Sequence, residues 1–523
     1  MVHQRWSRAA AVALVTGLLA PFMVPAAMHG AEAAPACGRR DRPETGVAGD
    51  VPLTDQLTGR ADEGYNCGLA LVGYSSLGGR GGNGNMAWSG DCAYIAGDGV
   101  AIVDVRDPAH PRHTGTLHAA GADATIETLH AVDAPGRSLL ATGRYGLFGL
   151  SGGEGTAPVD IWDTRDCSHP KHLTTIQFPA NVHNLTFTAD GKRLWSTLPL
   201  RAFDLTDLAR PKLLPDIEPE LAADGYPNYQ YAHEAWPSPD GTRLYVGGQF
   251  EPINEELLVV NTEGWPARKA TVEGRIALPG HSIRPMRING KPFLLNSDES
   301  ILNPVAKGCL PNELTPFAGA SRPYLTDISN EHYPQVRGEL RLPINDPIHC
   351  GEQTLSGVNA SVHYQDADDA DDTTFTMSSM WNAGLRIHDV RDPAHPREVA
   401  YFNPGTFPKA NPLEGDLDAG TVLGLQNPTG LDQAWAHVRY RPATGHIWLT
   451  TATGGFWVLE LEPQVRKALG LPAKPTAQPD GAIPRPAATR GSGTVGAAAM
   501  GGYCTLNSAT SVVASGIITR FGG

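Results

Sequence analysis

Short runs of apolar and β-branched residues recur along the chain, and their length and composition predict strands. Val100–Val105 (VAIVDV) and Leu385–Val390 (LRIHDV) are two such runs. Each leads into the same nine residues, DVRDPAHPR, at Asp104–Arg112 and Asp389–Arg397. The first Asp can accept hydrogen bonds from backbone N–H groups downstream, and Asp-Pro presets a tight corner. The second Pro begins another strand, which fits an outer edge strand because proline cannot donate to a neighbour.

This unit is repeated with variation, which indicates a repeat architecture. Four further segments resemble it: Asp163–Lys171, Asp204–Lys212, Asn261–Arg268 and Asp327–Gln335. Two of the segments that precede the copies, Thr186–Leu198 and Ala235–Gly247, have a strand, an Asp-Gly hairpin and a second strand. Each unit therefore has four antiparallel strands, the make-up of a propeller blade.

Seven units can be counted, and the last of them is incomplete. Its third strand, Gly455–Leu461, is followed by Pro-rich sequence, while a spare strand, Cys67–Tyr74, precedes the first unit. Pairing these two strands would leave no free sheet edge in the ring. We therefore predict an all-β fold, a seven-bladed β-propeller closed by an N-terminal strand, with disordered N- and C-terminal tails.

Ala101–Pro111 and Leu385–Pro396 resemble the unit of the LVIVD-repeat proteins, which are β-propellers of a secreted, bacterial type. The Asp-Gly hairpins are similar to YVTN-type propeller repeats. The resemblance covers about residues 67–463 and implies the fold but no particular activity. A looser similarity, confined to the Asp-Pro turn, links the chain to the selenium-binding protein/methanethiol oxidase propellers, which use histidines with copper.

The two ends of the chain differ from the repeats. Residues 1–33 combine a basic start, the apolar stretch Ala9–Ala20 and an A-x-A sequence at 31–33, which predicts a signal peptide and a secreted, extracellular protein. We expect an N-terminal extension at 34–66, the propeller at 67–463 and a Pro/Ala/Gly-rich tail at 464–523. Seven cysteines fit an oxidising compartment. Cys309 and Cys350 are the predicted disulfide, and the sequence leaves the other pairings open.

The formal net charge of −14 makes nucleic acid an improbable partner, because nucleic-acid binding requires a basic surface. It also disfavours adsorption to anionic lipid. The apolar stretches are too short for a stable membrane span. We expect a monomer whose ligand, whether protein, glycan or small molecule, the sequence does not identify.

Histidines open the innermost strand of six units. They are His130, His183, His233, His281, His363 and His437. In a closed ring these positions converge, and converging imidazoles can bind a transition metal such as Cu, Zn or Fe. Glu127 and Glu234 are candidate binding residues that would complete or orient such a site. Two alternatives stay open: the imidazoles could donate to neighbouring blades as structural groups, or one could be a catalytic base.

Two functions follow from these features. The first is a propeller that binds a macromolecular partner or ligand on its loop-rich face, since the long excursions Leu213–Gln230, Asp298–Pro323 and Asn403–Asp432 are specificity elements in such a fold. The alternative is a metal-dependent enzyme that uses the histidine ring. Whether the protein is an enzyme stays open at this level. The acidic run Asp366–Asp372 is interpreted as a solvated hairpin tip.

Overall fold

A computed structural model describes most of the repeat region. The described residues are 35, 37–80, 82–123, 125–144, 157–178, 182–227, 229, 232–248, 256–278, 280–297, 322–349, 351–352, 360–406 and 430–473. The predicted signal peptide, Cys309, Cys350 and the tail beyond 473 lie outside them.

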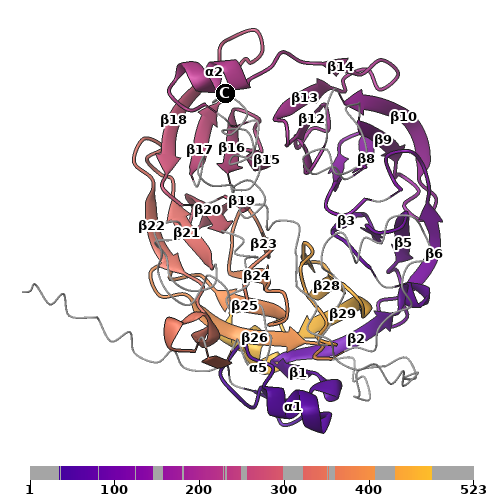
Figure 1. Cartoon of the computed structure of the whole chain (residues 1–523), viewed down its shortest axis with the longest axis vertical. Helices are drawn as coiled ribbons and strands as arrows, with labels where there is room; N and C mark the ends of the chain where they lie inside the picture. Colours follow the sequence, from indigo (N-terminus) through magenta and orange to yellow (C-terminus); the bar gives the residue numbers. More distant parts are fainter. Residues whose placement is uncertain are drawn as a thin grey trace, which may run out of the picture. The chain divides into compact units, whose positions relative to one another are not determined.

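The described strands form seven antiparallel sheets arranged in a ring around a central axis, as Figure 1 shows. Blade 1 consists of β3 (Met86–Ser89), β4 (Cys92–Ile95), β5 (Val100–Asp104) and β6 (Arg112–Leu117), and blade 2 of β7 (Leu129–Ala134), β8 (Arg137–Gly143), β9 (Ala157–Asp163) and β10 (Lys171–Phe178). Blade 3 consists of β11 (Leu185–Phe187), β12 (Arg193–Ser196), β13 (Arg201–Asp204) and β14 (Lys212–Leu213). Blade 4 consists of β15 (Ala232–Pro237), β16 (Arg243–Gly248), β17 (Leu257–Asn261) and β18 (Thr271–Ile276). Blade 5 consists of β19 (Ser282–Ile288), β20 (Lys291–Ser297), β21 (Pro323–Asp327) and β22 (Gln335–Glu339). Blade 6 contains β23 (Gln365–Ala367), β24 (Phe375–Ser379), β25 (Leu385–Asp389) and β26 (Arg397–Asn403). Blade 7 contains β27 (Arg439–Arg441), β28 (His446–Thr451) and β29 (Gly455–Leu461).

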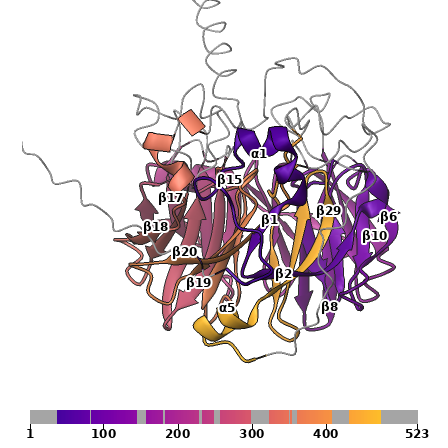
Figure 2. The same cartoon turned by 90° about the horizontal axis from the view of Figure 1, so that it is seen from below.

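An N-terminal strand completes blade 7. Strand β2 (Leu69–Ser75) pairs antiparallel with β29, from Leu69 opposite Leu461 to Ser75 opposite Phe456. Both views show the two strands side by side (Figures 1 and 2). The seven-bladed propeller and its closure by an N-terminal strand are confirmed.

The segment before β2 is also folded. It contains the helix α1 (Leu53–Thr58), the short 3-10 helix η1 (Arg60–Glu63) and β1 (Tyr65–Cys67). Strand β1 adds a fifth strand to blade 6 by pairing with β26. Glu44 forms an ion pair with Arg386, whose side chain is fully buried in blade 6. The segment is thus fastened to the outer side of this blade.

Two disulfides, neither assigned from the sequence, add covalent links. Cys37 joins Cys67 and ties the N-terminal segment to β1. Cys92 of β4 joins Cys167, which lies in the Asp-Pro-type turn of blade 2, so this bond connects two blades. Both bonds are compatible with an oxidising environment.

The repeated turn has the hydrogen bonds that the sequence predicts. Asp104 accepts the backbone N–H of Arg106 at 3.0 Å and the side chains of Arg106 and Arg112. The hydrogen bonds from Arg106, which outweigh partial burial, lower the pKa of Asp104 to about 2. The same aspartate–arginine arrangement recurs at Asp389, which Arg391 and Arg397 contact.

These turns pack against glycines on the outer strand of the preceding blade. The glycines lie at β-bulges, where the register shifts by one residue. A Cβ atom would come within 2.1 Å of the Pro108 carbonyl oxygen at Gly73, within 1.7 Å of that of Glu331 at Gly274, and within 2.2 Å of that of Pro393 at Gly338. A side chain at these bulges would therefore push the neighbouring turn away. The repeated turn acts as an inter-blade contact as well as a corner.

A candidate metal centre in the central channel

Four of the six predicted histidines surround one point of the channel. His183, His233, His281 and His363 belong to blades 3 to 6, and each precedes or begins the innermost strand. Their relative exposures are 0 to 1%. Burial of this kind requires that the ring nitrogens find partners.

One nitrogen of three of these imidazoles holds the neighbouring blade. The Nδ1 atom of His233 lies 3.0 Å from the carbonyl oxygen of His281, and that of His281 lies 3.1 Å from the carbonyl oxygen of His363. His363 continues the series toward the carbonyl oxygen of Trp435 at 2.5 Å. Because a carbonyl oxygen only accepts, each Nδ1 carries a hydrogen. Through Nδ1 these histidines therefore donate hydrogen bonds to neighbouring blades, which is the structural role considered for them.

The other nitrogen turns toward Glu127. Its carboxylate lies 3.3 Å from Nε2 of His183, 3.8 Å from Nε2 of His233 and 3.7 Å from Nε2 of His363. Ligand atoms of Glu127, His233 and His281 all lie within 4.8 Å of one another. With Nδ1 protonated, a neutral imidazole presents a lone pair at Nε2. Several lone pairs and one carboxylate thus converge.

The buried carboxylate of this cluster favours a cationic partner. The Nε2 atoms of His183 and His233 are 2.6 Å apart, so a hydrogen lies between them, which a neutral His183 protonated on Nε2 supplies to the lone pair of His233. Glu127 is 1% exposed, and a buried carboxylate is costly without a cationic partner. Imidazole nitrogens with a carboxylate form a donor set for Cu, Zn, Fe or Ni. The residues present fit a transition metal.

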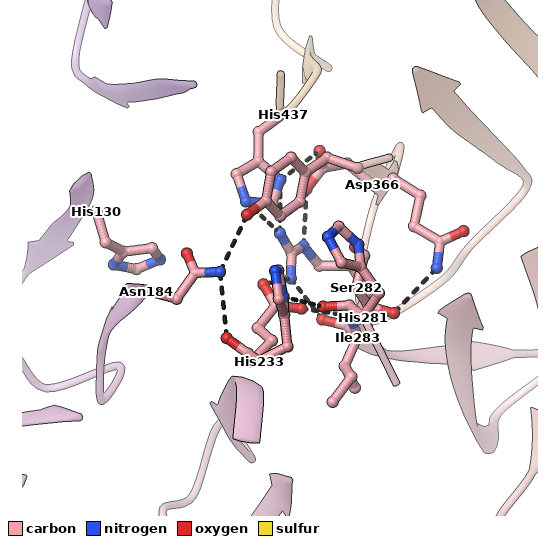
Figure 3. Close-up of polar contacts among 12 residues, drawn as sticks. His130, Asn184, His233, His281, Ser282, Ile283, Asp366 and His437 are labelled. Carbon is pink, nitrogen blue, oxygen red and sulfur yellow. Dashed lines mark hydrogen bonds and ion pairs between the residues drawn. The ribbon is translucent and has the colours of Figure 1, made fainter. Parts of the chain in front are cut away.

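Two residues that sequence reasoning did not select orient Glu127. The hydroxyl of Tyr364 donates to Oε2 of Glu127 at 3.0 Å and accepts from Nδ2 of Asn184 at 3.0 Å. Burial, followed by the charges of Glu127 and Glu234, raises the pKa of Tyr364 well above its usual value. The phenol therefore keeps its hydrogen at physiological pH and donates it to Glu127. Figure 3 shows the same Asn184 amide joined by a dashed line to the backbone oxygen of His233.

The remaining predicted residues lie in a second layer around Arg284. Arg284 is 3.0 Å from Glu234 and 2.9 Å from Asp366, and its guanidinium lies 3.7 Å from the centre of the Trp236 ring. His437 is 3.3 Å from Asp366. The interpretation of Asp366 as part of a solvated tip is wrong, because this carboxylate is buried and paired with Arg284 and His437.

His130 belongs to this second layer too. Its ring packs edge-on against Trp236, with ring centroids 5.2 Å apart. Burial, with a smaller contribution from the charge of Arg284, lowers the pKa of His130 to about 3. His130 is thus a neutral side chain at physiological pH. Figure 3 shows it apart from His233 and His281.

The six histidines separate because two of them are shifted along their strands. The position that contacts the His183 carbonyl oxygen in blade 2 is Thr128, two residues before His130. The position that receives the His363 hydrogen bond in blade 7 is Trp435, two residues before His437. A shift of two residues keeps the same side of the strand but moves the side chain along the channel. A residue-by-residue comparison of strand starts could have found this offset.

Comparison with known proteins supports the repeat. Residues 81–118 match the LVIVD repeat. No curated protein matches the chain significantly.

Solved structures with a similar chain path include that described as the Crystal Structure of Mitotic Checkpoint Complex, at 10% identity, with 82% of this chain and 98% of the other covered and a TM-score of 0.42. Another is the β-propeller domain of Myceliophteria thermophila Cps50 (Swd1), at 11% identity, with 73% and 96% covered and a TM-score of 0.43. Across the part of the chain that the structure describes, no helix is long and apolar enough to cross a membrane.

Proposed function

We propose that this LVIVD-repeat propeller holds a transition-metal ion in its central channel and is a secreted, metal-dependent enzyme. One observation carries the proposal: the Nε2 atoms of His183, His233 and His363 face the single carboxylate of Glu127, while carbonyl oxygens occupy Nδ1 of His233 and His363. Nothing in a purely structural role requires four imidazoles to meet at one carboxylate.

The chain's own residues would each have a defined part. His183, His233, His281 and His363 supply nitrogen ligands whose orientation is set by Nδ1 bonds or by packing, and Glu127 supplies charge. Tyr364 keeps Glu127 turned toward the imidazoles. Such outer hydrogen bonds raise metal affinity by fixing ligand geometry. A bound Cu, Fe or Zn ion would supply redox or Lewis-acid chemistry.

The test is metal content and affinity of the full-length protein. We expect about one equivalent of Cu, Zn or Fe per chain after purification without chelators, and binding that weakens as pH falls below the imidazole pKa of about 6.5. His233→Gln should weaken binding by roughly tenfold or more. His395→Gln, a change at an exposed turn histidine, should leave it unchanged. Metal-free protein that does not take up these ions, or a His233→Gln variant with unaltered affinity, would refute the proposal.

Partner binding at the loop-rich face stays a prediction. Propellers commonly serve as interaction scaffolds, and long loops of one face usually carry specificity. Most of the excursions at 298–323 and 403–432 lies outside the described residues. Export is likewise part of the proposal, and the Cys37–Cys67 and Cys92–Cys167 disulfides support it.

A further inference from the structure

Blade 6 has two faces of opposite character. The apolar residues of β24 and β25 share a buried cluster with residues of β28 and β29, so they face blade 7. Side chains alternate along a strand, so the intervening residues face blade 5. These are Thr376, Ser378, Arg386 and His388. Ala367, the cross-strand neighbour of Thr376, confirms the direction because it packs on the Met286 and Phe293 cluster of blade 5.

This polar interface contains several buried atoms that have no hydrogen-bond partner among the described residues. They are the hydroxyls of Ser282, Ser297, Thr376 and Ser378, the Oε1 atom of Gln365, and both ring nitrogens of His388. They are also neighbours, because strand pairing sets Ser282 opposite Ser297, Gln365 opposite Ser378, and Thr376 opposite His388. We call this set the blade 5–6 seam.

The seam spans the width of the sheets. At its inner end Ser282 follows His281 directly, and the Nε2 atom of Gln365, two residues after His363, donates to the Ser282 carbonyl oxygen at 3.2 Å. At its outer end Arg386, the cross-strand neighbour of Ser378, contacts Glu398 at 3.1 Å and also pairs with Glu44. The seam therefore connects the histidine–Glu127 cluster with the N-terminal segment.

We propose that the blade 5–6 seam holds a file of ordered water that serves as the route for water and protons between the histidine–Glu127 cluster and the outer rim of the propeller. Buried hydroxyls and imidazoles almost always have partners, and water is the usual one where several polar atoms adjoin. Hydroxyl groups both donate and accept, so they can pass a proton along.

The need for such a route comes from the burial of the cluster. Glu127 and the four imidazoles around it are at most 1% exposed. In the second layer Arg284 is stacked on Trp236. This inference concerns water and holds whether or not the cluster binds a metal, so the two proposals can fail separately.

Crystallography of the unsubstituted full-length protein, at a resolution that shows water, tests the first half. We expect ordered water within hydrogen-bond distance of Thr376 Oγ1, Ser378 Oγ and Ser282 Oγ. Density for protein side chains in this space, or a dry interface, would overturn the proposal.

Hydrogen exchange tests the second half. In protein labelled with 15N-histidine, the Nδ1–H groups of His281 and His363 should exchange into D2O roughly tenfold or more slowly in the double variant Thr376→Val/Ser378→Ala than in the unsubstituted protein. Thr326→Val is the control, since Thr326 is equally buried in blade 5 but its hydroxyl already bonds Asn296 at 2.8 Å. Ordered water together with unchanged exchange in the double variant would refute the route.

Discussion

Replacing one bulge glycine by alanine should show how much the contact between blades contributes to the free energy of unfolding, apart from the effect of backbone entropy. At Gly338 an added Cβ would lie 2.2 Å from the Pro393 carbonyl oxygen, whereas real Cβ contacts essentially never fall under 3.0 Å. The blade 6 turn would have to retreat, and overpacking of this kind costs about 1–3 kcal/mol. Gly338→Ala also removes unfolded-state entropy, a gain of about 0.4–1 kcal/mol. We expect a net loss of about 1–2 kcal/mol.

The chain contains a matched control. Gly115 occupies the same bulge position on the outer strand of blade 1, and no atom of the described residues lies within 4 Å of the point that a Cβ atom would occupy there. Gly115→Ala should therefore keep only the entropic gain and raise stability by about 0.4–1 kcal/mol. Urea denaturation of the two variants beside the unsubstituted protein measures both effects. Equal stability of Gly338→Ala and Gly115→Ala would refute the argument that the repeated turns require glycine at these contacts.

Two further predictions concern acid and reductant. Burial lowers the pKa of His388 to about 3, below the 6.5 of an unfolded histidine, so stability is complete above pH 6.5 and declines as pH falls toward 3. At pH 5 the protonation of this group in the unfolded chain should lower the free energy of unfolding by about 2 kcal/mol relative to pH 7. Urea titrations at pH 7 and pH 5 should show that His388→Leu loses less stability between the two pH values than the unsubstituted protein does. Equal losses in the two proteins would contradict this. Cys92→Ser/Cys167→Ser should cost up to about 4 kcal/mol, because the bond closes a loop with a sequence separation of 75. Denaturation without reductant measures that loss, and an unchanged midpoint would show that the bond adds no stability.

The ring could be predicted from sequence because its evidence is repeated. Asp104 and Asp389 stand in identical nine-residue turns, and a strand without a partner at each end of the repeat region implied closure. A periodic signal of this kind survives local errors, since each blade must bury the same faces as its neighbours.

The candidate site was only partly predictable because it depends on register within each strand. His130 and His437 are displaced from the Glu127 cluster by two residues, an offset that only a residue-by-residue comparison of strand starts could have found. Tyr364 carries no motif, and Asp366 begins an acidic run typical of an exposed tip. Both matter because the start of blade 6 brings them beside Glu127 and Arg284. The Cys92–Cys167 pair depends on contact between two blades, so spacing alone could not assign it.

The closing strand also determines when the protein can finish folding. Tyr74 of β2 contacts Gly454 beside β29, and 380 positions separate them in the chain. Bringing such distant residues together costs roughly 5 kcal/mol of chain entropy, and contacts of long sequence separation form slowly. Strand β2, one of the first strands synthesised, must therefore wait for β29, the last. Until then β2 exposes an unpaired edge, so a chain emerging in stages stays open to mispairing until residue 461 has been released.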